Sequence, residues 1–283
     1  MIKSKVVKIG NISVSNDLPI VLIAGPCMLE SREVVFRCAE SLVKTSSELN
    51  IPLIFKTSFD KANRTSLNAK RGLPFDEALR VFEELRKSFD FPIITDVHES
   101  TQIEVISQHV DVLQIPAYLC RQTDLLIAAA KSGKAINVKK GQFLAPWDMK
   151  NVLEKITMSG NENVMLCERG ACFGYNRLVS DMRSLKIMSD WGYPVIFDAT
   201  HSVQEPGGLG GASGGNREYV ELLARAAASI GVAGLFIETH FDPKNALSDG
   251  PNMVPLHAVK GFIETIQKFD KLAKETLYQD MSC

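Results

Sequence analysis

Short apolar runs alternate with longer amphipathic segments along the chain. The short runs have the length and composition of buried β-strands, and the longer segments carry apolar residues at three- and four-residue spacing, as amphipathic helices do. The predicted strands are residues 19–24, 52–56, 92–96, 110–115, 135–138, 163–167, 194–198 and 233–238. The predicted helices include residues 32–49, 74–88, 122–132, 146–159, 216–230 and 256–272. The pattern therefore predicts eight strands in a series of strand–helix units.

Eight such units in a row favour an α/β fold of the closed parallel (β/α)8 type, a TIM barrel. The chain has 283 residues, and about 250 is usual for such a barrel. An open doubly wound sheet is the alternative, but no glycine fingerprint of the nucleotide-binding kind follows the first predicted strand. No linker or low-complexity tract divides residues 1–283, so we expect a single domain, with residues 1–17 forming an N-terminal β-hairpin that turns at Gly10-Asn11.

Composition narrows the class of protein. The formal net charge of -1 argues against a nucleic-acid-binding protein with a generally basic surface. No apolar run approaches the roughly 18 residues that a membrane span needs, and the N-terminus lacks the apolar core of a signal peptide. Six scattered cysteines fit a reducing compartment better than a disulfide framework. We therefore expect a cytoplasmic protein that binds neither nucleic acid nor membrane.

Cationic residues gather where predicted strands end, which is where a barrel of this type carries its chemistry. The set is Lys56, Lys61, Arg64, Lys139 and Arg169, with Arg121 as a further candidate. Around one barrel mouth these charges would repel one another unless an anionic ligand were bound. They suggest two phosphorylated substrates, or one that carries both phosphate and carboxylate. For any single lysine, and for the basic segment 56–66 as a whole, a solvated surface loop is the competing explanation.

A second set combines a thiol, an imidazole and two carboxylates: Cys27, His201, Glu238 and Asp249. They follow or end the first, seventh and eighth predicted strands, which are neighbours in a closed barrel. Mixed sulfur, nitrogen and oxygen ligands suit Zn²⁺, Fe²⁺ or Mn²⁺ better than Mg²⁺ or Ca²⁺. The spacing adds no support, however, and a cysteine such as Cys27 is more often a small buried residue. Residue types alone leave both explanations open.

The segment 206–215, after the seventh predicted strand, is rich in glycine. Such a segment near the barrel mouth is a candidate lid over a bound substrate. A long surface loop explains the composition nearly as well, so both interpretations stay open.

The strand-end motifs resemble those of the 3-deoxy-D-manno-octulosonate 8-phosphate synthase family, and the resemblance covers essentially the whole chain. The motifs that carry it include Gly25-Pro26-Cys27, Lys61-Ala62-Asn63-Arg64, Thr95-Asp96-Val97-His98-Glu99, Gln114-Ile115-Pro116-Ala117, Asn137-Val138-Lys139-Lys140-Gly141, Cys167-Glu168-Arg169-Gly170, Asp198-Ala199-Thr200-His201-Ser202 and Ser248-Asp249-Gly250-Pro251. The sibling family of 3-deoxy-D-arabino-heptulosonate 7-phosphate synthases typically has Lys-Pro-Arg where this chain has Lys61-Ala62-Asn63-Arg64.

The resemblance implies condensation of phosphoenolpyruvate with D-arabinose 5-phosphate and water, on the route to the lipopolysaccharide inner core. It implies that Lys61, Lys139 and Arg169 hold the phosphate and carboxylate of phosphoenolpyruvate in a pocket lined by Gln114, Pro116 and Ala117. Lys56, Ser58, Asn63 and Arg64 would belong to the substrate-binding segment, and Arg121 would reach the sugar phosphate from a neighbouring subunit of a homotetramer. Asp96, His98 and Asp249 are the candidates for proton transfer.

The family that the chain resembles has a metal-dependent and a metal-independent branch. The metal-independent branch has asparagine where this chain has Cys27, and usually proline where it has Gly141. The resemblance therefore favours one divalent ion, Zn²⁺, Fe²⁺ or Mn²⁺, at Cys27, His201, Glu238 and Asp249. Three alternatives stay open: the seven-carbon sibling synthase using erythrose 4-phosphate, a metal-dependent sugar-phosphate aldolase, and a phosphosugar-binding barrel without catalysis.

Overall fold

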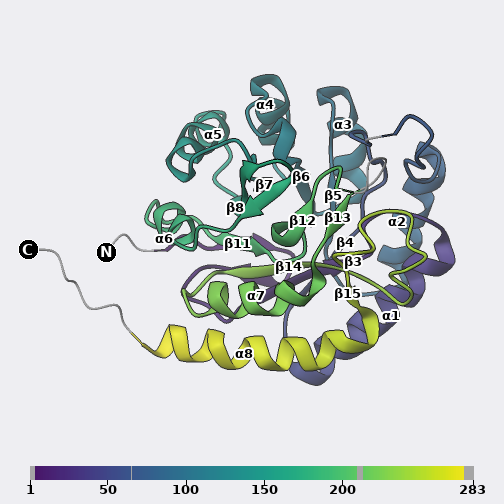
Figure 1. Cartoon of the computed structure of the whole chain (residues 1–283). Helices are drawn as coiled ribbons and strands as arrows, with labels where there is room; N and C mark the ends of the chain where they lie inside the picture. The colour runs from purple at the N-terminus through teal and green to yellow at the C-terminus, as the bar shows by residue number, and fades with distance from the viewer. Residues whose placement is uncertain (1–3, 65, 209–212, 277–283) are drawn as a thin grey trace, which may run out of the picture.

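The computed structural model describes residues 4–64, 66–208 and 213–276, which contain a closed barrel of eight parallel strands (Figure 1). The strands are β3 (Val21–Gly25), β4 (Leu53–Lys56), β5 (Ile93–Asp96), β6 (Val112–Ile115), β7 (Ala135–Lys139), β8 (Val164–Glu168), β11 (Val195–Asp198) and β14 (Gly234–His240). Neighbours pair in chain order, and β14 pairs with both β11 and β3, which closes the ring. The predicted (β/α)8 fold and all eight predicted strands are confirmed. The predicted single domain over residues 1–283 stays a prediction.

Helices follow the barrel strands and cover the outside of the barrel (Figure 1). They are α1 (Arg32–Leu49), α2 (Phe75–Ser88), α3 (Ser100–His109), α4 (Thr123–Lys131), α5 (Met149–Thr157), α6 (Arg183–Ser189), α7 (Val220–Ala228) and α8 (Val259–Glu275). The helix α1 has the predicted bounds because Ser31 caps its first turn and Asn50 ends it in the left-handed conformation, at φ 48°. Three predicted helices begin instead as 3-10 turns, at η2 (Pro146–Asp148), η4 (Arg217–Tyr219) and η5 (Leu256–Ala258).

The N-terminal hairpin is confirmed and packs against the base of the barrel. Strands β1 (Val7–Ile9) and β2 (Ile12–Val14) pair around Gly10, whose φ of 59° suits glycine. The inward side chains of the hairpin are buried in one apolar cluster with barrel-interior residues such as Ile23 and Met165. A second, larger cluster lies between the strands and the helices. The hairpin therefore covers the N-terminal end of the barrel, and the C-terminal end is the one left for a ligand.

Short elements are added at the C-terminal end of the barrel. They are η1 (Ala117–Leu119), the hairpin β9 (Ala171–Gly174) and β10 (Arg177–Val179), η3 (His201–Val203), the pair β12 (Gln204–Glu205) and β13 (Gly214–Gly215), and β15 (Val254–Pro255). Of the candidate lid 206–215, residues 209–212 lie outside the described residues. The pairing of β12 with β13 brings the two ends of this segment together at the barrel mouth.

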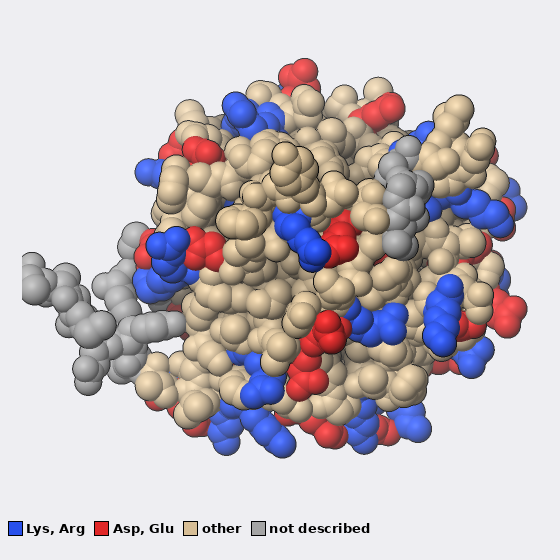
Figure 2. Space-filling view, in the orientation of Figure 1, with Lys and Arg blue, Asp and Glu red and all other residues tan. Residues whose placement is uncertain are grey.

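The structure also bears on the expected absence of a membrane span and on the state of the cysteines. None of the helices in the described ranges is long and apolar enough to cross a membrane. Cys27, Cys38, Cys120, Cys167 and Cys172 are all free thiols, and Cys283 lies outside the described residues. Over the face seen in Figure 2, both basic and acidic side chains are scattered among uncharged residues.

Candidate active site

A cavity of about 840 Å³ opens at the C-terminal ends of the barrel strands. Most of the predicted site residues line it: Lys56, Lys61, Asn63, Arg64, Asp96, His98, Gln114, Pro116, Ala117, Lys139, Arg169, His201, Glu238 and Asp249. Cys27 and Ser58 are buried directly behind its wall. The C-terminal mouth of the barrel therefore gathers residues from all along the chain into one site.

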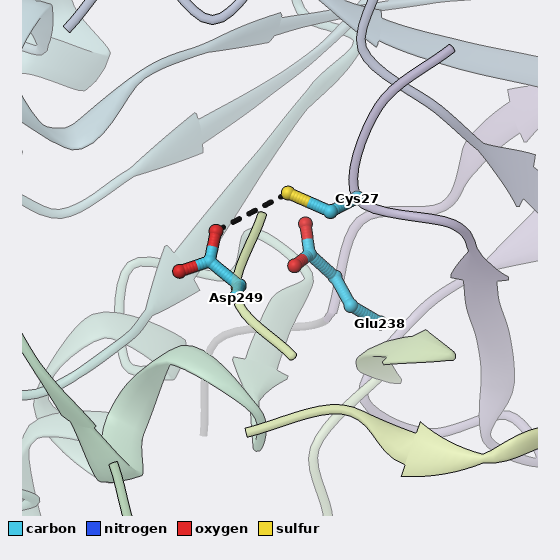
Figure 3. Close-up of side chains that lie close together, drawn as sticks. All are labelled: Cys27, Glu238 and Asp249. Carbon is cyan, nitrogen blue, oxygen red and sulfur yellow. Dashed lines mark hydrogen bonds between the residues drawn. The ribbon is translucent and has the colours of Figure 1, made fainter. Parts of the chain in front are cut away.

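Cys27, Glu238 and Asp249 form a compact cluster at this site, drawn in Figure 3. One candidate ligand atom from each residue lies within 4.8 Å of the other two, and the Cys27 thiol donates to Oδ2 of Asp249 at 3.2 Å. Barrel closure creates the cluster, because the pairing of β14 with β3 places Glu238 beside Gly25, two residues before Cys27. Asp249 comes from the loop after β14, where its φ of 51° turns the chain towards the cavity.

The electrostatics of the cluster suit a bound cation. Burial, and then Glu238, raise the pKa of the Cys27 thiol well above its ordinary value. Burial opposes ionisation of Asp249, but the facing His201 and Lys61 outweigh it and lower its pKa. One carboxylate oxygen of Glu238, Oε2, is buried without a hydrogen bond. A divalent cation would give that oxygen a partner and would favour the thiolate, so the residues fit a metal with mixed ligands.

His201 lies beside this cluster and is held by Asp198. Its Nδ1 is 2.8 Å from Oδ2 of Asp198, and its Nε2 is 3.6 Å from Oε2 of Glu238. Its own ligand atoms fall outside the group of three that lies within 4.8 Å. An imidazole held through one nitrogen by a carboxylate, with the other nitrogen directed at candidate ligands, is the usual arrangement of a metal-binding histidine.

Two lysines from the segment after β4 face the same cluster. Lys56 is buried, and its ammonium donates to Oε1 of Glu238 at 2.6 Å and to the carbonyl of Cys27 at 2.9 Å. Lys61 donates to the Ser58 hydroxyl at 2.9 Å and lies 4.0 Å from Oε1 of Glu238. The Lys56 side chain is 1% exposed and that of Lys61 13% exposed, so Lys56 chiefly balances the charge of the cluster and Lys61 is the more accessible cation.

Arg169 and Lys139 form a second cationic region across the cavity. Nη2 of Arg169 donates to Gln204 at 2.7 Å, while its buried Nη1 has no hydrogen-bond partner among the residues that the structure describes. The Arg169 turn is shaped by Glu168, whose Oε1 accepts the backbone N–H groups of Arg169 and Gly170. The ammonium of Lys139 forms an ion pair with Asp198 and lies 3.7 Å from the centre of the Phe236 ring. A buried guanidinium donor without a partner is a ready binding group for an anion.

The remaining predicted residues differ in their surroundings. Nε2 of His98 lies 3.1 Å from Oδ2 of Asp96 inside the cavity. Burial opposes ionisation of Asp96, but Lys61 and His98 outweigh it and lower its pKa. Arg64 donates to the Ser248 hydroxyl and the Leu247 carbonyl, both at 2.7 Å. Arg121 is exposed and does not line the cavity of its own chain.

Asp198, Gln204 and Ser248 hold the site together but carry no role in the sequence-based prediction. Asp198 orients His201 and Lys139, Gln204 contacts Arg169, and Ser248 contacts Arg64. The position of Asp198 at the end of a predicted strand was a usable signal. Gln204 lies in the two-residue strand β12 and Ser248 in the loop after β14, and neither short setting gives a sequence signal of where the side chain points.

The fold and the site define a (β/α)8 protein whose barrel mouth gathers cationic side chains beside a group of candidate metal ligands. The model of the DAHP synthetase I family matches residues 2–275. The 2-dehydro-3-deoxyphosphooctonate aldolase of Bartonella henselae is 60% identical over 96% of this chain and 98% of that protein. The proteins of the same name from Brucella anthropi and Brucella melitensis are 63% and 61% identical, each over 95% of this chain and 97% of theirs. The chain therefore belongs to the DAHP synthetase I family, as a full-length relative of its 2-dehydro-3-deoxyphosphooctonate aldolases.

Proposed function

We infer that this chain is an enzyme that condenses phosphoenolpyruvate with D-arabinose 5-phosphate and water, releasing 3-deoxy-D-manno-octulosonate 8-phosphate and inorganic phosphate. The product is a precursor of the lipopolysaccharide inner core. The observation that carries the inference is the single cavity lined by Lys61, Arg64, Lys139 and Arg169, which suits two anionic substrates together. The relatives that match over nearly their full length are named 2-dehydro-3-deoxyphosphooctonate aldolase, and this name refers to the same eight-carbon product.

Phosphoenolpyruvate carries a phosphate and a carboxylate, and we assign both to three cations that line the cavity. Lys61, Lys139 and Arg169 bind these groups, and Nη1 of Arg169 supplies a buried donor without an acceptor in the described part of the chain. Gln114, Pro116 and Ala117 line the same cavity and enclose the substrate. The segment with Lys56 and Ser58 supports Lys61 from behind, through the 2.9 Å hydrogen bond between Lys61 and Ser58.

The sugar phosphate binds towards the outer rim, where Asn63 and Arg64 line the cavity. Arg121 reaches the corresponding site of a neighbouring subunit in a homotetramer, because it is exposed on its own chain. Exposed aromatic side chains near the rim support an assembly: Phe143 is 55%, Trp147 64% and Phe173 79% exposed. The free cysteines support a reducing, cytoplasmic location.

Cys27, His201, Glu238 and Asp249 hold one divalent ion, Zn²⁺, Fe²⁺ or Mn²⁺. When bound, the ion supplies Lewis acidity that polarises the aldehyde of the sugar phosphate or a water. Lys56 offsets the negative charge of Glu238 and keeps that carboxylate ionised. Asp198 directs the imidazole of His201 towards the group by holding its Nδ1.

The protein's own residues perform the remaining steps by position and charge. Carbon three of phosphoenolpyruvate bonds to the aldehyde carbon, water adds at carbon two, and the bond from carbon two to the phosphate oxygen breaks. Lys61, Lys139 and Arg169 stabilise the charge on the departing phosphate. Asp96 and His98 form a hydrogen-bonded pair in the cavity that can hold a proton. The third candidate for proton transfer, Asp249, has a lowered pKa and is assigned instead to the metal.

The test is phosphate release by purified protein from phosphoenolpyruvate, in the presence of either arabinose 5-phosphate or erythrose 4-phosphate. We expect rapid release with arabinose 5-phosphate and little with erythrose 4-phosphate. The reverse preference would identify the seven-carbon synthase. Cleavage of a sugar phosphate without phosphoenolpyruvate would identify a sugar-phosphate aldolase. Binding without turnover would identify a phosphosugar-binding barrel without catalysis.

A further inference from the structure

Gln204 connects the phosphoenolpyruvate cations to the candidate metal ligands. Its Oε1 accepts a hydrogen bond from Nη2 of Arg169 at 2.7 Å, and its Nε2 donates to Oδ1 of Asp249 at 2.6 Å. The orientation of the amide is forced, because a guanidinium offers only donors and a carboxylate only acceptors. One side chain thus bridges a residue assigned to the anionic substrate and a residue assigned to the cation.

We propose that Gln204 is a positioning residue that couples the binding of phosphoenolpyruvate to the binding of the divalent ion. The proposal rests on the proposed function, which assigns Arg169 to the substrate and Asp249 to the metal. Linkage requires the coupling to be reciprocal: the ion tightens phosphoenolpyruvate binding by the same factor by which phosphoenolpyruvate tightens ion binding.

The backbone of Gln204 is fixed at the mouth of the barrel. Its N–H closes the 3-10 turn η3 on the carbonyl of His201, and the residue pairs with Gly215 between β12 and β13. Gly215 leaves no room for a larger residue, since a Cβ there would lie 1.5 Å from Oδ1 of Asn252. Asn252 in turn donates its backbone N–H to the carbonyl of Asp249 at 2.9 Å. The bridging side chain therefore extends from a well-defined support towards both of its partners.

The contacts at the two ends explain how a change at one ligand reaches the other. Oδ2 of Asp249 already accepts from the Ser248 hydroxyl at 2.9 Å and from the Cys27 thiol at 3.2 Å, and Gln204 holds the second oxygen. At the other end, Gln204 takes Nη2 of Arg169, which leaves the buried Nη1 for an anion. An ion that fixes Asp249 thereby fixes Gln204 and then Arg169 in the arrangement that binds an anion. A bound anion that fixes Arg169 likewise fixes Gln204 and then Asp249 in the arrangement that binds the ion.

Direct attraction between an anion and a cation would also couple the two ligands, so the test must isolate Gln204. We would titrate Mn²⁺ into metal-stripped protein by calorimetry, alone and with saturating phosphoenolpyruvate or inorganic phosphate. The Gln204→Met variant keeps a similar volume but loses both hydrogen bonds. The matched control is Gln267→Met on α8, because the Gln267 amide donates only to the Leu49 carbonyl, at 3.1 Å, and lies outside the cavity lining.

In the unmodified protein we expect phosphoenolpyruvate to tighten Mn²⁺ binding by about 10-fold. In Gln204→Met we expect Mn²⁺ binding to weaken by about 10-fold and most of the enhancement by phosphoenolpyruvate to disappear. Gln267→Met should behave like the unmodified protein. If Gln204→Met does not fold, as judged by circular dichroism, Gln204→Ala carries the same expectation.

An enhancement that is as large in the Gln204 variant as in the unmodified protein would overturn the proposal, and so would an unmodified protein that binds no Mn²⁺. The proposed function is judged separately, by phosphate release with arabinose 5-phosphate. If Gln204 couples the binding of Mn²⁺ to that of inorganic phosphate but the protein shows no turnover, the coupling proposal stands and the proposed function is wrong. If the protein turns over but the coupling is unaltered in Gln204→Met, the coupling proposal is wrong and the proposed function stands.

Discussion

Substitution of Lys56 by methionine is expected to make the stability of the protein depend on bound metal. Lys56 and Glu238 form an ion pair at 2.6 Å, and both side chains are 1% exposed. Methionine has a similar length and no charge, so the variant leaves the Glu238 carboxylate buried with its nearest cation removed. Burial opposes ionisation of Glu238, and after Lys56 the groups that lower its pKa are His201 and Lys61. Nε2 of His201 lies 3.6 Å from Oε2 of Glu238, and Lys61 lies 4.0 Å from Oε1, the oxygen that pairs with Lys56.

The geometry sets the size of the effect. At an effective dielectric constant of about 20, the attraction across 2.6 Å is about 6 kcal/mol, and across the 4.0 Å to Lys61 it is about 4 kcal/mol. The desolvation of Lys56 is recovered in the variant, which reduces the net loss. Breaking one side of a buried ion pair usually costs about 3–5 kcal/mol, and we expect the metal-free Lys56→Met variant to fall in this range.

A divalent ion at Cys27, Glu238 and Asp249 would supply the missing positive charge. Urea unfolding, followed by circular dichroism with chelator and with excess Mn²⁺, measures the free energy of unfolding in both states. We expect Mn²⁺ to restore more stability to Lys56→Met than it adds to the unmodified protein. Lys140→Met is the matched control, because Lys140 is also buried, lies 3.5 Å from Glu168 and has no contact with the cluster.

Mn²⁺ should therefore stabilise Lys140→Met only as much as it stabilises the unmodified protein. A metal-free Lys56→Met protein that loses less than about 1 kcal/mol would refute the reasoning, since such a loss is typical of an exposed ion pair. Equal rescue of the two lysine variants by Mn²⁺ would refute the placement of the ion beside Glu238.

Three further predictions concern other parts of the site. Burial opposes ionisation of Asp198, but His201 and Lys139 outweigh it and hold its pKa well below 3.8. The ionised Asp198 carboxylate therefore stabilises the folded protein fully at neutral pH, and this contribution is lost progressively as the pH falls below about 4. The urea midpoint should accordingly decline less steeply with acid in Asp198→Asn than in the unmodified protein. Parallel declines would contradict this. Cys27→Asn is expected to retain part of the phosphate-release activity and to lose its response to chelator, and a folded but wholly inactive variant would argue against an orienting role for the metal. Replacement of Ala62-Asn63 by a single proline should lower the ratio of kcat/KM for arabinose 5-phosphate over erythrose 4-phosphate, whereas an unchanged ratio would show that the choice of sugar is made elsewhere.

The barrel strands were predictable because each is buried on both faces. A strand such as Val195–Asp198 carries a continuous apolar run that ends in a polar residue, and this pattern recurs along the chain. The helices α3 and α6 were not among those predicted. The segment Ser100–His109 mixes apolar and polar residues with weak periodicity, and Arg183–Ser189 has only seven residues. Both are stabilised by packing on the barrel rather than by a strong local pattern.

The site was predictable as far as barrel closure and strand ends determine it. Closure brings Cys27 and Glu238 together, since β3 and β14 are the first and last strands of the ring. The side-chain directions were not predictable. Lys56 lines the cavity, but nothing in the sequence indicated that its ammonium would pair with Glu238. Arg121 is exposed on its own chain, which is compatible with the expected contact to a neighbouring subunit. Gln204 acquires its contacts from the turn η3 and the β12–β13 pair, which depend on contacts distant in sequence.

The most direct test of the account is phosphate release from phosphoenolpyruvate and arabinose 5-phosphate by chelator-treated protein, as Mn²⁺, Zn²⁺ or Fe²⁺ is added back in measured amounts. The cavity brings the cations that we propose bind phosphate close to Cys27, Glu238 and Asp249. We predict almost no release without metal, and activity that rises and saturates near one ion per chain. Full activity in protein shown to be free of metal would contradict the account.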